Sequence, residues 1–515
     1  MTRWLQNRKD RFINGEVEYR LRNDYSLVVG YNFQVKPLIK KLLCSDENLT
    51  VLLMTDRNVR SIRLEFATEL TKDEIGRLLF MRRDLAVDRS YQNIRIRGAR
   101  SIYLMGDEEC PGRDGIILRA SEMIAAKATS EQRLESDAPV SAFLQFENPN
   151  IYSQMRSQEL LLDRKDADRR AIFDLEVFNY YDSWVWKCLS EKDSSDGNDP
   201  YLPIRFKPDA ERVELFVIGS GMAVKAVVDS AITLMNYGDD TRHCRLTIVS
   251  DRVSEIMPPD DVIASLPELE LVDYSLKDLN RKVAADMVDA AMDEKCAVTV
   301  AIIEDSPEKS MRTYMNLPFA LRNKEISVLL WLETQTRNLT EKPLVKIDGD
   351  RTELRYFGMT DCPPWFGSNR QAMGVAVQYY YTDCCGDKRM PKGTDVSLIS
   401  VAKELWDEDK AKQEWKNKER WRKWSSICSA GSFKEKMSII CGRALTSELQ
   451  LKLLKAEHNR WWAERLLADW RPGKRDNDRR LHPNLVPFEK LDELTKDVDK
   501  LSIAAMAQQG FIAAS

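Results

Sequence analysis

The chain has 515 residues, of which 43% are hydrophobic and 31% charged, and its net charge is −4. At about 100–200 residues per domain, this length favours three folded domains, and the composition excludes a disordered chain or a uniformly basic one. The charge is uneven: residues 401–515 hold 23 basic and 18 acidic residues, so we expect an anionic ligand first at that end.

The sequence indicates a cytoplasmic protein with no transmembrane segment. It has no apolar run of about 18 residues, the length a membrane-spanning helix needs, and its N-terminus lacks the apolar core of a signal peptide. The ten cysteines form no CxxC pair and there are three histidines. Free thiols are therefore expected, and no metal site.

The first predicted domain, residues 1–195, opens with the order of a dinucleotide-binding unit. A β-branched run at 25–32 contains a glycine turn, and a helical pattern follows it. The next strand, at 49–55, is followed directly by an acidic residue. In such a unit, glycines let the backbone approach a pyrophosphate at a helix N-terminus, and the acid binds ribose hydroxyls. Asn32 replaces the second glycine of the fingerprint. The candidate residues are Gly30, Asn32 and Asp56.

The region after this opening is less regular. A strand is predicted at 141–146, an aromatic-rich helix at 173–189 and a linker at 190–200, where Ser, Asp, Gly and Pro gather.

The second predicted domain, residues 196–360, repeats the opening. A strand at 213–218 leads into a glycine turn, a helical pattern and a strand at 246–250. Val224 replaces the third glycine, so this fingerprint is also incomplete. Later apolar runs in both domains predict parallel sheets with intervening helices. The candidate residues here are Gly219, Ser220, Gly221 and Asp251.

The pair of units, over roughly residues 20–350, resembles the tandem RCK (regulator of potassium conductance, TrkA-N type) domains of ion channels and transporters. The Gly30-Tyr31-Asn32 turn with Asp56 is similar to the variant turn of plant-type symbiosis ion channels. The resemblance implies a Rossmann-like fold that pairs with itself, as a dimer or higher homo-oligomer, and senses nucleotides or ions. Because this chain shows no pore, gating would act on a separate channel.

The third predicted domain, residues 361–515, is mostly helical. Four tryptophans among Lys, Arg and Glu at 406–424 predict an amphipathic, salt-bridged helix. Interleaved acids argue against a nucleic-acid surface there, so nucleic acid is not expected as the primary partner. A stronger helical pattern covers 446–470, and Pro472-Gly473 ends it.

The segment 446–505 resembles the RyR domain, the repeat first seen in ryanodine receptors and also found in bacterial proteins. The matching residues are Glu457-His458-Asn459-Arg460-Trp461, Ala463-Glu464, Trp470, Gly473, Arg475-Asp476, His482-Pro483 and Leu485-Val486-Pro487-Phe488. Asp469 and Phe488 replace the family's usual Gly and Tyr.

The RyR resemblance implies an adenine-nucleotide site, and the residue types agree. Indoles stack on bases, and guanidinium groups bind phosphates. The alternative is that Glu457 to Arg460 form an internal network that holds the repeat together. The candidate ligand-binding residues are Asn459, Arg460, Trp461, Trp462, Arg465, Trp470, Arg471, Lys474, Arg475, Asp476, His482 and Phe488.

The sequence favours a regulatory protein over an enzyme. It has no nucleophile–base motif, no HExxH motif and no P-loop, so no catalytic residue is named. The expected ligand is a small nucleotide: an adenine nucleotide, NAD or an ADP-ribose-like compound. By analogy, such a sensor would suit bacterial antiviral signalling. An enzyme that consumes NAD(P) or another nucleotide on the Rossmann-like units, and a soluble RCK-like gating subunit, remain alternatives.

Overall fold

The computed structural model describes residues 2–108, 110–132, 134, 138–163, 171–190, 204, 207, 209–332, 352–358, 369–385, 389–391, 393 and 397–512. These residues form two compact units, one ending at Tyr180 and the other beginning at Tyr181. In the described part of the chain, no helix is long and apolar enough to cross a membrane. The three-domain boundaries predicted from the sequence stay a prediction.

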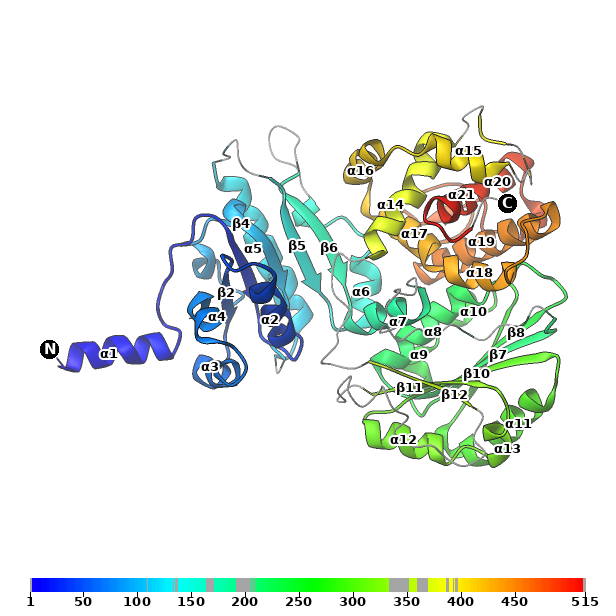
Figure 1. The fold of residues 1–515 in the computed structure, drawn as a ribbon, viewed down its shortest axis with the longest axis horizontal. Helices are drawn as coiled ribbons and strands as arrows, with labels where there is room; N and C mark the ends of the chain where they lie inside the picture. The colour runs from blue at the N-terminus through cyan, green and yellow to red at the C-terminus, as the bar shows by residue number, and fades with distance from the viewer. Residues whose placement is uncertain are drawn as a thin grey trace. The chain divides into compact units, whose positions relative to one another are not determined.

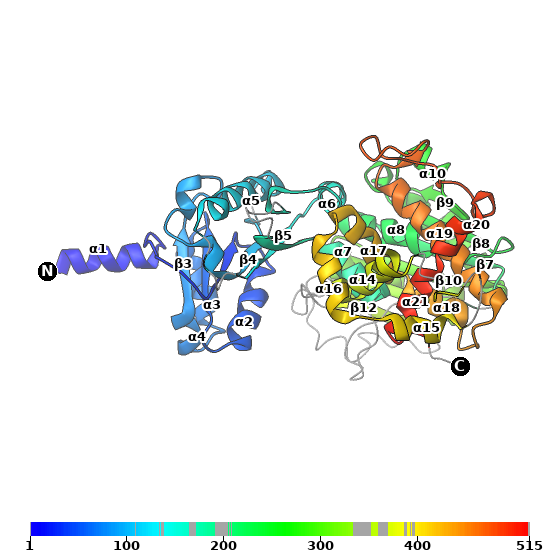
Figure 2. The same ribbon diagram turned by 90° about the horizontal axis from the view of Figure 1, so that it is seen from above.

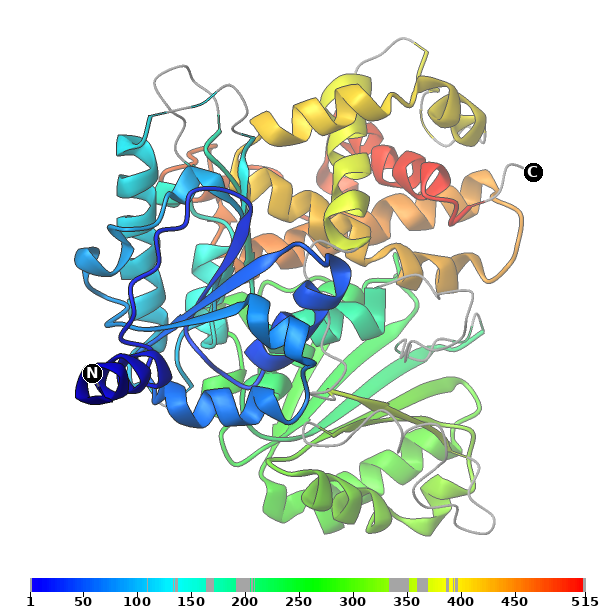
Figure 3. The ribbon, with the colours of Figure 1, turned by 60° about the vertical axis from the view of Figure 1, so that its left-hand side comes forward.

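The first unit is a six-stranded parallel sheet in the order β3-β2-β1-β4-β5-β6, with helices on both faces (Figures 1 and 3). Its central strands are apolar throughout because both faces of a parallel sheet are covered. The elements are α1 (Thr2–Ile13), β1 (Tyr25–Val29), α2 (Val35–Ser45), β2 (Thr50–Thr55), α3 (Val59–Ala67), α4 (Lys72–Arg77), β3 (Leu78–Arg82), β4 (Ala99–Leu104), α5 (Arg113–Ser130), β5 (Val140–Gln145), α6 (Pro149–Met155) and β6 (Phe173–Phe178).

The aromatic stretch at 173–189 is not the single helix that its pattern predicted. It forms the edge strand β6 and then α7 (Tyr180–Ser190). Between them, the Asn179 side chain donates hydrogen bonds to the carbonyls of Phe146 and Glu147, at 2.8 and 2.9 Å. Aromatic residues suit both helices and strands, so spacing alone did not separate the two elements.

The second unit contains another six-stranded parallel sheet, in the order β12-β11-β10-β7-β8-β9. Both sheets therefore have the strand order of a Rossmann fold, as the sequence predicted. The elements are β7 (Arg212–Gly219), α8 (Met222–Leu234), β8 (His243–Val249), α9 (Val253–Ile256), α10 (Asp260–Ile263), β9 (Leu269–Tyr274), α11 (Ala284–Met292), β10 (Cys296–Ile303), α12 (Pro307–Met315), α13 (Phe319–Arg322), β11 (Ser327–Trp331) and β12 (Glu353–Phe357).

The remainder of the second unit is the predicted helical region. The stretch 406–424 divides at Lys418 and Glu419 into parts of two helices instead of forming one, and its Trp415 and Trp424 are buried. The elements are α14 (Asn369–Tyr379), α15 (Leu398–Leu405), α16 (Glu408–Asn417), α17 (Arg420–Gly431), α18 (Phe433–Ile440), α19 (Ser447–Leu467), β13 (Arg471–Pro472), β14 (Leu481–His482), α20 (Glu493–Val498) and α21 (Lys500–Gln508).

Helix α19 anchors the helical region on the second sheet, where it packs beside α8 (Figure 2). Gly238, in the loop after α8, has φ +63°, and a Cβ there would lie 2.1 Å from the carbonyl oxygen of Lys452. Charge reinforces this close approach, because Lys452 pairs with Asp239 at 3.4 Å and Lys455 pairs with Asp240.

Candidate functional site

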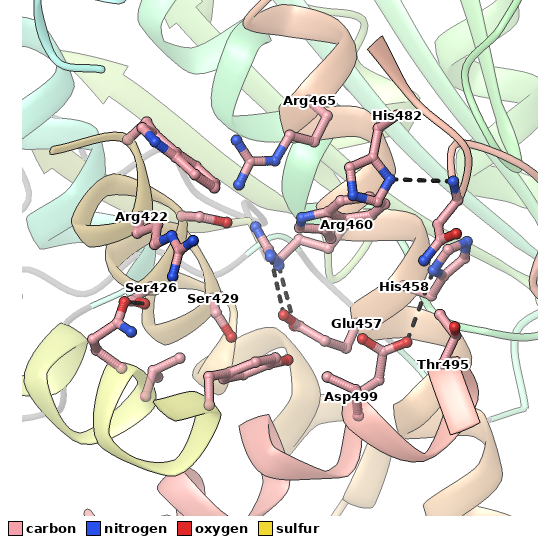
Figure 4. A pocket seen from close by; sticks show the side chains of 18 of the residues that line it. Arg422, Ser426, Ser429, Glu457, His458, Arg460, Arg465, His482, Thr495 and Asp499 are labelled. Carbon is pink, nitrogen blue, oxygen red and sulfur yellow. Dashed lines mark hydrogen bonds and ion pairs between the residues drawn. The ribbon is translucent and has the colours of Figure 1, made fainter. Parts of the chain in front are cut away.

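A cavity of about 550 Å³ opens within the helical region. Its walls come from α14, α17, α19, the loop that leads to His482, and the end of α20 (Figure 4). This volume lies in the range of small-molecule sites, about 300–1,000 Å³. Six of the predicted ligand-binding residues line it: Arg460, Trp461, Arg465, Trp470, Arg475 and His482.

Arg465 is the central cation of this cavity. Its guanidinium carbon lies 5.1, 5.7 and 5.2 Å from the ring centres of Trp421, Trp461 and Trp470. The side chain is 6% exposed, and its nearest carboxylate oxygen, on Glu464, is 4.0 Å away. Among the described residues no group hydrogen-bonds this guanidinium. Burial lowers the pKa of Arg465, which nevertheless stays charged, so its donors are available to an anion.

Arg475 adds a second positive charge at this end of the cavity. It is exposed, and no described residue forms an ion pair or hydrogen bond with it. Burial, with the charges of Arg475 and Arg465, lowers the pKa of His482 to about 4. His482 is therefore neutral at pH 7, and its Nδ1 accepts a hydrogen bond from the Asn484 amide at 3.1 Å.

Glu457 and Arg460 line the cavity and form an ion pair, while Nη1 of Arg460 is buried without a hydrogen-bond partner among the described residues. Arg460 donates from Nε and Nη2 to the two Glu457 oxygens, at 3.1 and 2.9 Å, and Lys436 donates to the same carboxylate. Burial opposes the charge, but Arg460 and Lys436 lower the pKa of Glu457 to about 2. Of the four residues that the scaffold alternative groups together, Glu457 and Arg460 thus share one buried network.

His458 is also engaged within the fold. Its Nε2 lies 2.8 Å from the carbonyl oxygen of Val486, which can only accept, so Nε2 carries the proton. Burial lowers the pKa of His458, and the ring is neutral at pH 7. Its Nδ1 faces Asp499 Oδ2 at 3.8 Å, beyond hydrogen-bond distance.

The other six predicted ligand-binding residues lie outside the cavity lining. Asn459 is buried and lies near Glu268 of the second sheet's domain, and Arg471 pairs with Asp261 there at 2.8 Å. The Asp476 carboxylate accepts from the backbone amides of Asp478 and Arg479. The remaining three are Trp462, which packs against the Trp470 cluster, Phe488, which packs on His458, and Lys474, which is exposed.

The sequence analysis did not single out the part of the cavity that comes from α14 and α17. Trp421 and Arg422 fall in the aromatic and basic run that was expected only to pack and form salt bridges. The aromatic and basic pattern of that run was the signal that could have identified these two residues. Helix α14 contains no residue of the RyR-like motif, so the sequence offered no reason to select it. The lining residues on these helices, on the π-helical turn after α14 and on the turn between α16 and α17 include Gln378, Tyr381, Lys418, Trp421, Arg422, Ser425, Ser426 and Ser429.

The glycine turn of the second sheet has two residues in backbone conformations that favour glycine. Gly219 and Gly221 have φ +133° and +92°, and nothing lies within 4 Å of a Cβ built at Gly221, at the N-terminus of α8. The Ser220 hydroxyl donates to Asp305 at 3.2 Å. Asp251 accepts from the Ser275 hydroxyl at 2.9 Å.

The turn of the first sheet is filled by its own side chains. The Asn32 amide donates to the Met105 carbonyl and to Gln145 Oε1, both at 2.9 Å. A Cβ at Gly30 would meet the Gly106 backbone at 2.3 Å. Asp56 lines a neighbouring cavity of about 240 Å³, below the usual range for ligand sites.

No protein-family model matches the chain, and neither does any curated protein. It is similar to a solved structure described as GsuK bound to ADP, with 13% identity, 64% of this chain and 66% of that chain covered, and a TM-score of 0.35. The chain thus spans just under two thirds of that structure. It is also similar to the GsuK RCK domain (10% identity, 64% and 74% covered, TM-score 0.34) and to the human SLO3 gating ring (8%, 60% and 73%, 0.36). RCK proteins are therefore among its structural neighbours, but likeness at this level carries no inference about ligands or partners.

Proposed function

We propose that the chain is a regulatory protein that senses a small nucleotide in the cavity of its helical region. The observation that carries this proposal is Arg465: a buried guanidinium, held among three indole rings, with no hydrogen-bond partner in the described part of the chain. An anion that enters the cavity would supply that partner. A charge-assisted hydrogen bond to a guanidinium is among the stronger ones in proteins.

The surroundings of Arg465 favour a nucleotide over a simple anion. Trp421, Trp461 and Trp470 offer aromatic surface on which a base can stack, at about 1–3 kcal/mol per base. Arg475, which has no ion-pair partner among the described residues, adds a cation for a phosphate. The resemblance of residues 446–505 to the RyR domain points to an adenine-type nucleotide, including NAD and ADP-ribose-like compounds.

The proposed output is a change in the association of this chain with copies of itself. Helix α19 carries cavity residues on one side and contacts the second sheet's domain through Lys452 and Lys455 on another. Occupancy of the cavity can therefore bias the position of α19 against α8, provided the ligand prefers one arrangement. By analogy, such a sensor would suit bacterial antiviral signalling.

Thermal unfolding with ATP, ADP, ADP-ribose and NAD tests the proposed function. A ligand that binds only the folded state stabilises it by about 2.7 kcal/mol at a hundred times its Kd, so at least one compound should raise the melting temperature measurably. Arg475→Ala should abolish the increase, because it removes a cavity cation. The neighbouring Lys474→Ala is the matched control, since Lys474 is exposed and outside the lining. If none of the compounds shifts the melting temperature at saturation, the proposal is wrong.

A further inference from the structure

Helix α1 leaves its large apolar side chains in water. The side chains of Trp4, Leu5 and Phe12 are 62%, 52% and 48% exposed. An α-helix turns by about 100° per residue, so these three positions fall within one arc of about 100° around the helix axis. Single exposed apolar side chains are ordinary, but a group that shares one face marks an interaction surface. We call this arc the apolar face of α1.

The charged residues of α1 are arranged around its apolar face. Lys9 and Arg11 fall about 80° to either side of the centre of that face, and Asp10 falls opposite it. Arg8 lies one turn after Trp4, with its guanidinium carbon 5.4 Å from the indole ring centre. The hydrocarbon part of such a side chain covers apolar surface while the charge stays in water. Basic groups therefore border the apolar face, and the acid points away from it.

The C-terminal end of α1 is fixed to the first unit by Arg63 of α3. Arg63 Nη2 donates a hydrogen bond to the Phe12 carbonyl at 3.1 Å. The guanidinium carbon of Arg63 lies 4.4 Å from the ring centre of Phe12 and 4.3 Å from that of Phe80. Residues 4–10 are all exposed, and no ion pair of Lys9 or Arg11 is found within the described residues. The helix is thus held at one end, and most of its length is open to a partner.

We propose that α1 docks on an anionic phospholipid surface, with its apolar face among the headgroups and its bordering cations on the lipid phosphates. Helices that lie in the membrane interface have this pattern of Trp, Phe and Leu on one face and basic residues around it. The charge is complementary, because α1 contains four basic residues and one acidic residue in a chain whose net charge is −4. The inference does not depend on the cavity in the helical region.

The length of α1 decides how it would meet the bilayer. With 12 residues, α1 is shorter than the roughly 20 residues that a membrane-spanning helix needs, so it lies on the surface and does not cross. Isolated helices of this length are marginally stable in water. Contact with an interface that buries the apolar face therefore also stabilises the helix.

A second copy of the chain suits the apolar face less well than a bilayer does. Two such faces in contact would bring the cations of both helices together, and like charges oppose association. Three side chains also supply far less surface than the roughly 1,200–2,000 Å² that a stable protein–protein interface buries. An anionic bilayer supplies the opposite charge and requires no complementary shape.

Co-sedimentation of the full chain with lipid vesicles tests the proposal. The chain should bind phosphatidylcholine vesicles that contain phosphatidylserine, and should bind pure phosphatidylcholine about tenfold or more weakly, because that lipid has no net charge. Lys9→Gln should weaken binding about fivefold, the usual effect of one cation at an anionic surface. Trp4→Ala should weaken it about tenfold, because it removes the largest side chain of the apolar face.

Two variants outside α1 are matched controls. Lys277→Gln also removes one exposed cation, and Leu494→Ala removes a leucine side chain that is 83% exposed. Both should bind vesicles as the wild-type chain does. If either control weakens binding as much as the α1 variants do, the lipid contact is not specific to α1 and the proposal is overturned.

The remaining outcomes are equally decisive. An absence of binding to both kinds of vesicle overturns the proposal, and so does equal binding to the two. Sedimentation velocity without lipid tests the second copy: an oligomer that Trp4→Ala dissociates, in a chain that binds no vesicle, would assign the apolar face to self-association. Melting curves show whether the variants fold, and Arg11→Gln decides the case if Lys9→Gln or Trp4→Ala does not.

Discussion

At the scale of single residues, the RyR-like motif divides into two sets that share a helix. Glu457 and Arg460 neutralise each other in a buried network, whereas Arg465 is held by indole rings and has no hydrogen-bond partner among described residues. The sequence showed the charges but not their pairing. Pairing depends on which side chains the fold brings within about 4 Å, and Lys436 of α18 reaches Glu457 only in the folded chain.

The pKa of His482 reports on the cationic end of the cavity. Arg475→Ala should raise it from about 4, because that variant removes one of the two cations that lower it. Burial and Arg465 remain, so the value should stay below 6.5. The imidazole signals can be followed by NMR, because the chain has only three histidines.

Two further measurements belong with this titration. Lys474→Ala is the control and should leave the pKa of His482 unchanged; an unchanged value in Arg475→Ala as well would contradict the placement of Arg475. The lowered pKa also sets how stability depends on pH. Between about pH 4 and 6.5, His482 binds its proton more tightly in the unfolded state than in the folded state. His482 therefore reduces the free energy of unfolding as the pH falls through that window.

At the scale of elements, the glycine turns show why an incomplete fingerprint still built the expected fold. Gly219 is required by the strands, because a Cβ there would lie 1.8 Å from the Ile303 carbonyl oxygen, and its φ is +133°. Gly221 faces open space. The sequence could predict both glycine turns from their place after a strand, but not that Asn32 fills the first one with its own amide.

The two glycines of the second turn should tolerate alanine differently. Gly221→Ala should cost about 1–3 kcal/mol of unfolding free energy, the usual range for a strained backbone conformation. Gly219→Ala should cost more, because β7 and β10 must also separate to relieve the clash. Urea denaturation of the two variants measures both values. Equal losses would show that the turn is not held against β10 as described.

At the scale of the whole molecule, the chain contains two compact units with separate cores, and the candidate site belongs entirely to the second. Chains of this kind commonly unfold in more than one transition. The site lies beside the contact of α19 with α8, where Gly238 allows the close approach. A ligand in the cavity should therefore stabilise the second unit selectively.

Differential scanning calorimetry can test this selectivity. With a nucleotide that binds, the transition of the second unit should move to higher temperature and that of the first unit should stay in place, because a ligand stabilises only the unit that binds it. Arg475→Ala should remove the shift without altering the first transition. A shift confined to the first unit's transition would instead favour a site in the first unit.

The sequence by itself determined the two parallel sheets, their glycine turns and the long helix α19, because strand and helix periodicity and turn chemistry are local properties of the chain. It also indicated the cationic C-terminal region. It did not reveal the edge strand β6, whose aromatic residues fit either element.

Only the tertiary structure decided which motif residues face a cavity. Trp421 of α17 reaches Arg465 of α19 through packing between segments far apart in the sequence. Periodicity assigns a residue to a helix face, but only the neighbouring elements decide whether that face is filled, paired or left open to a ligand.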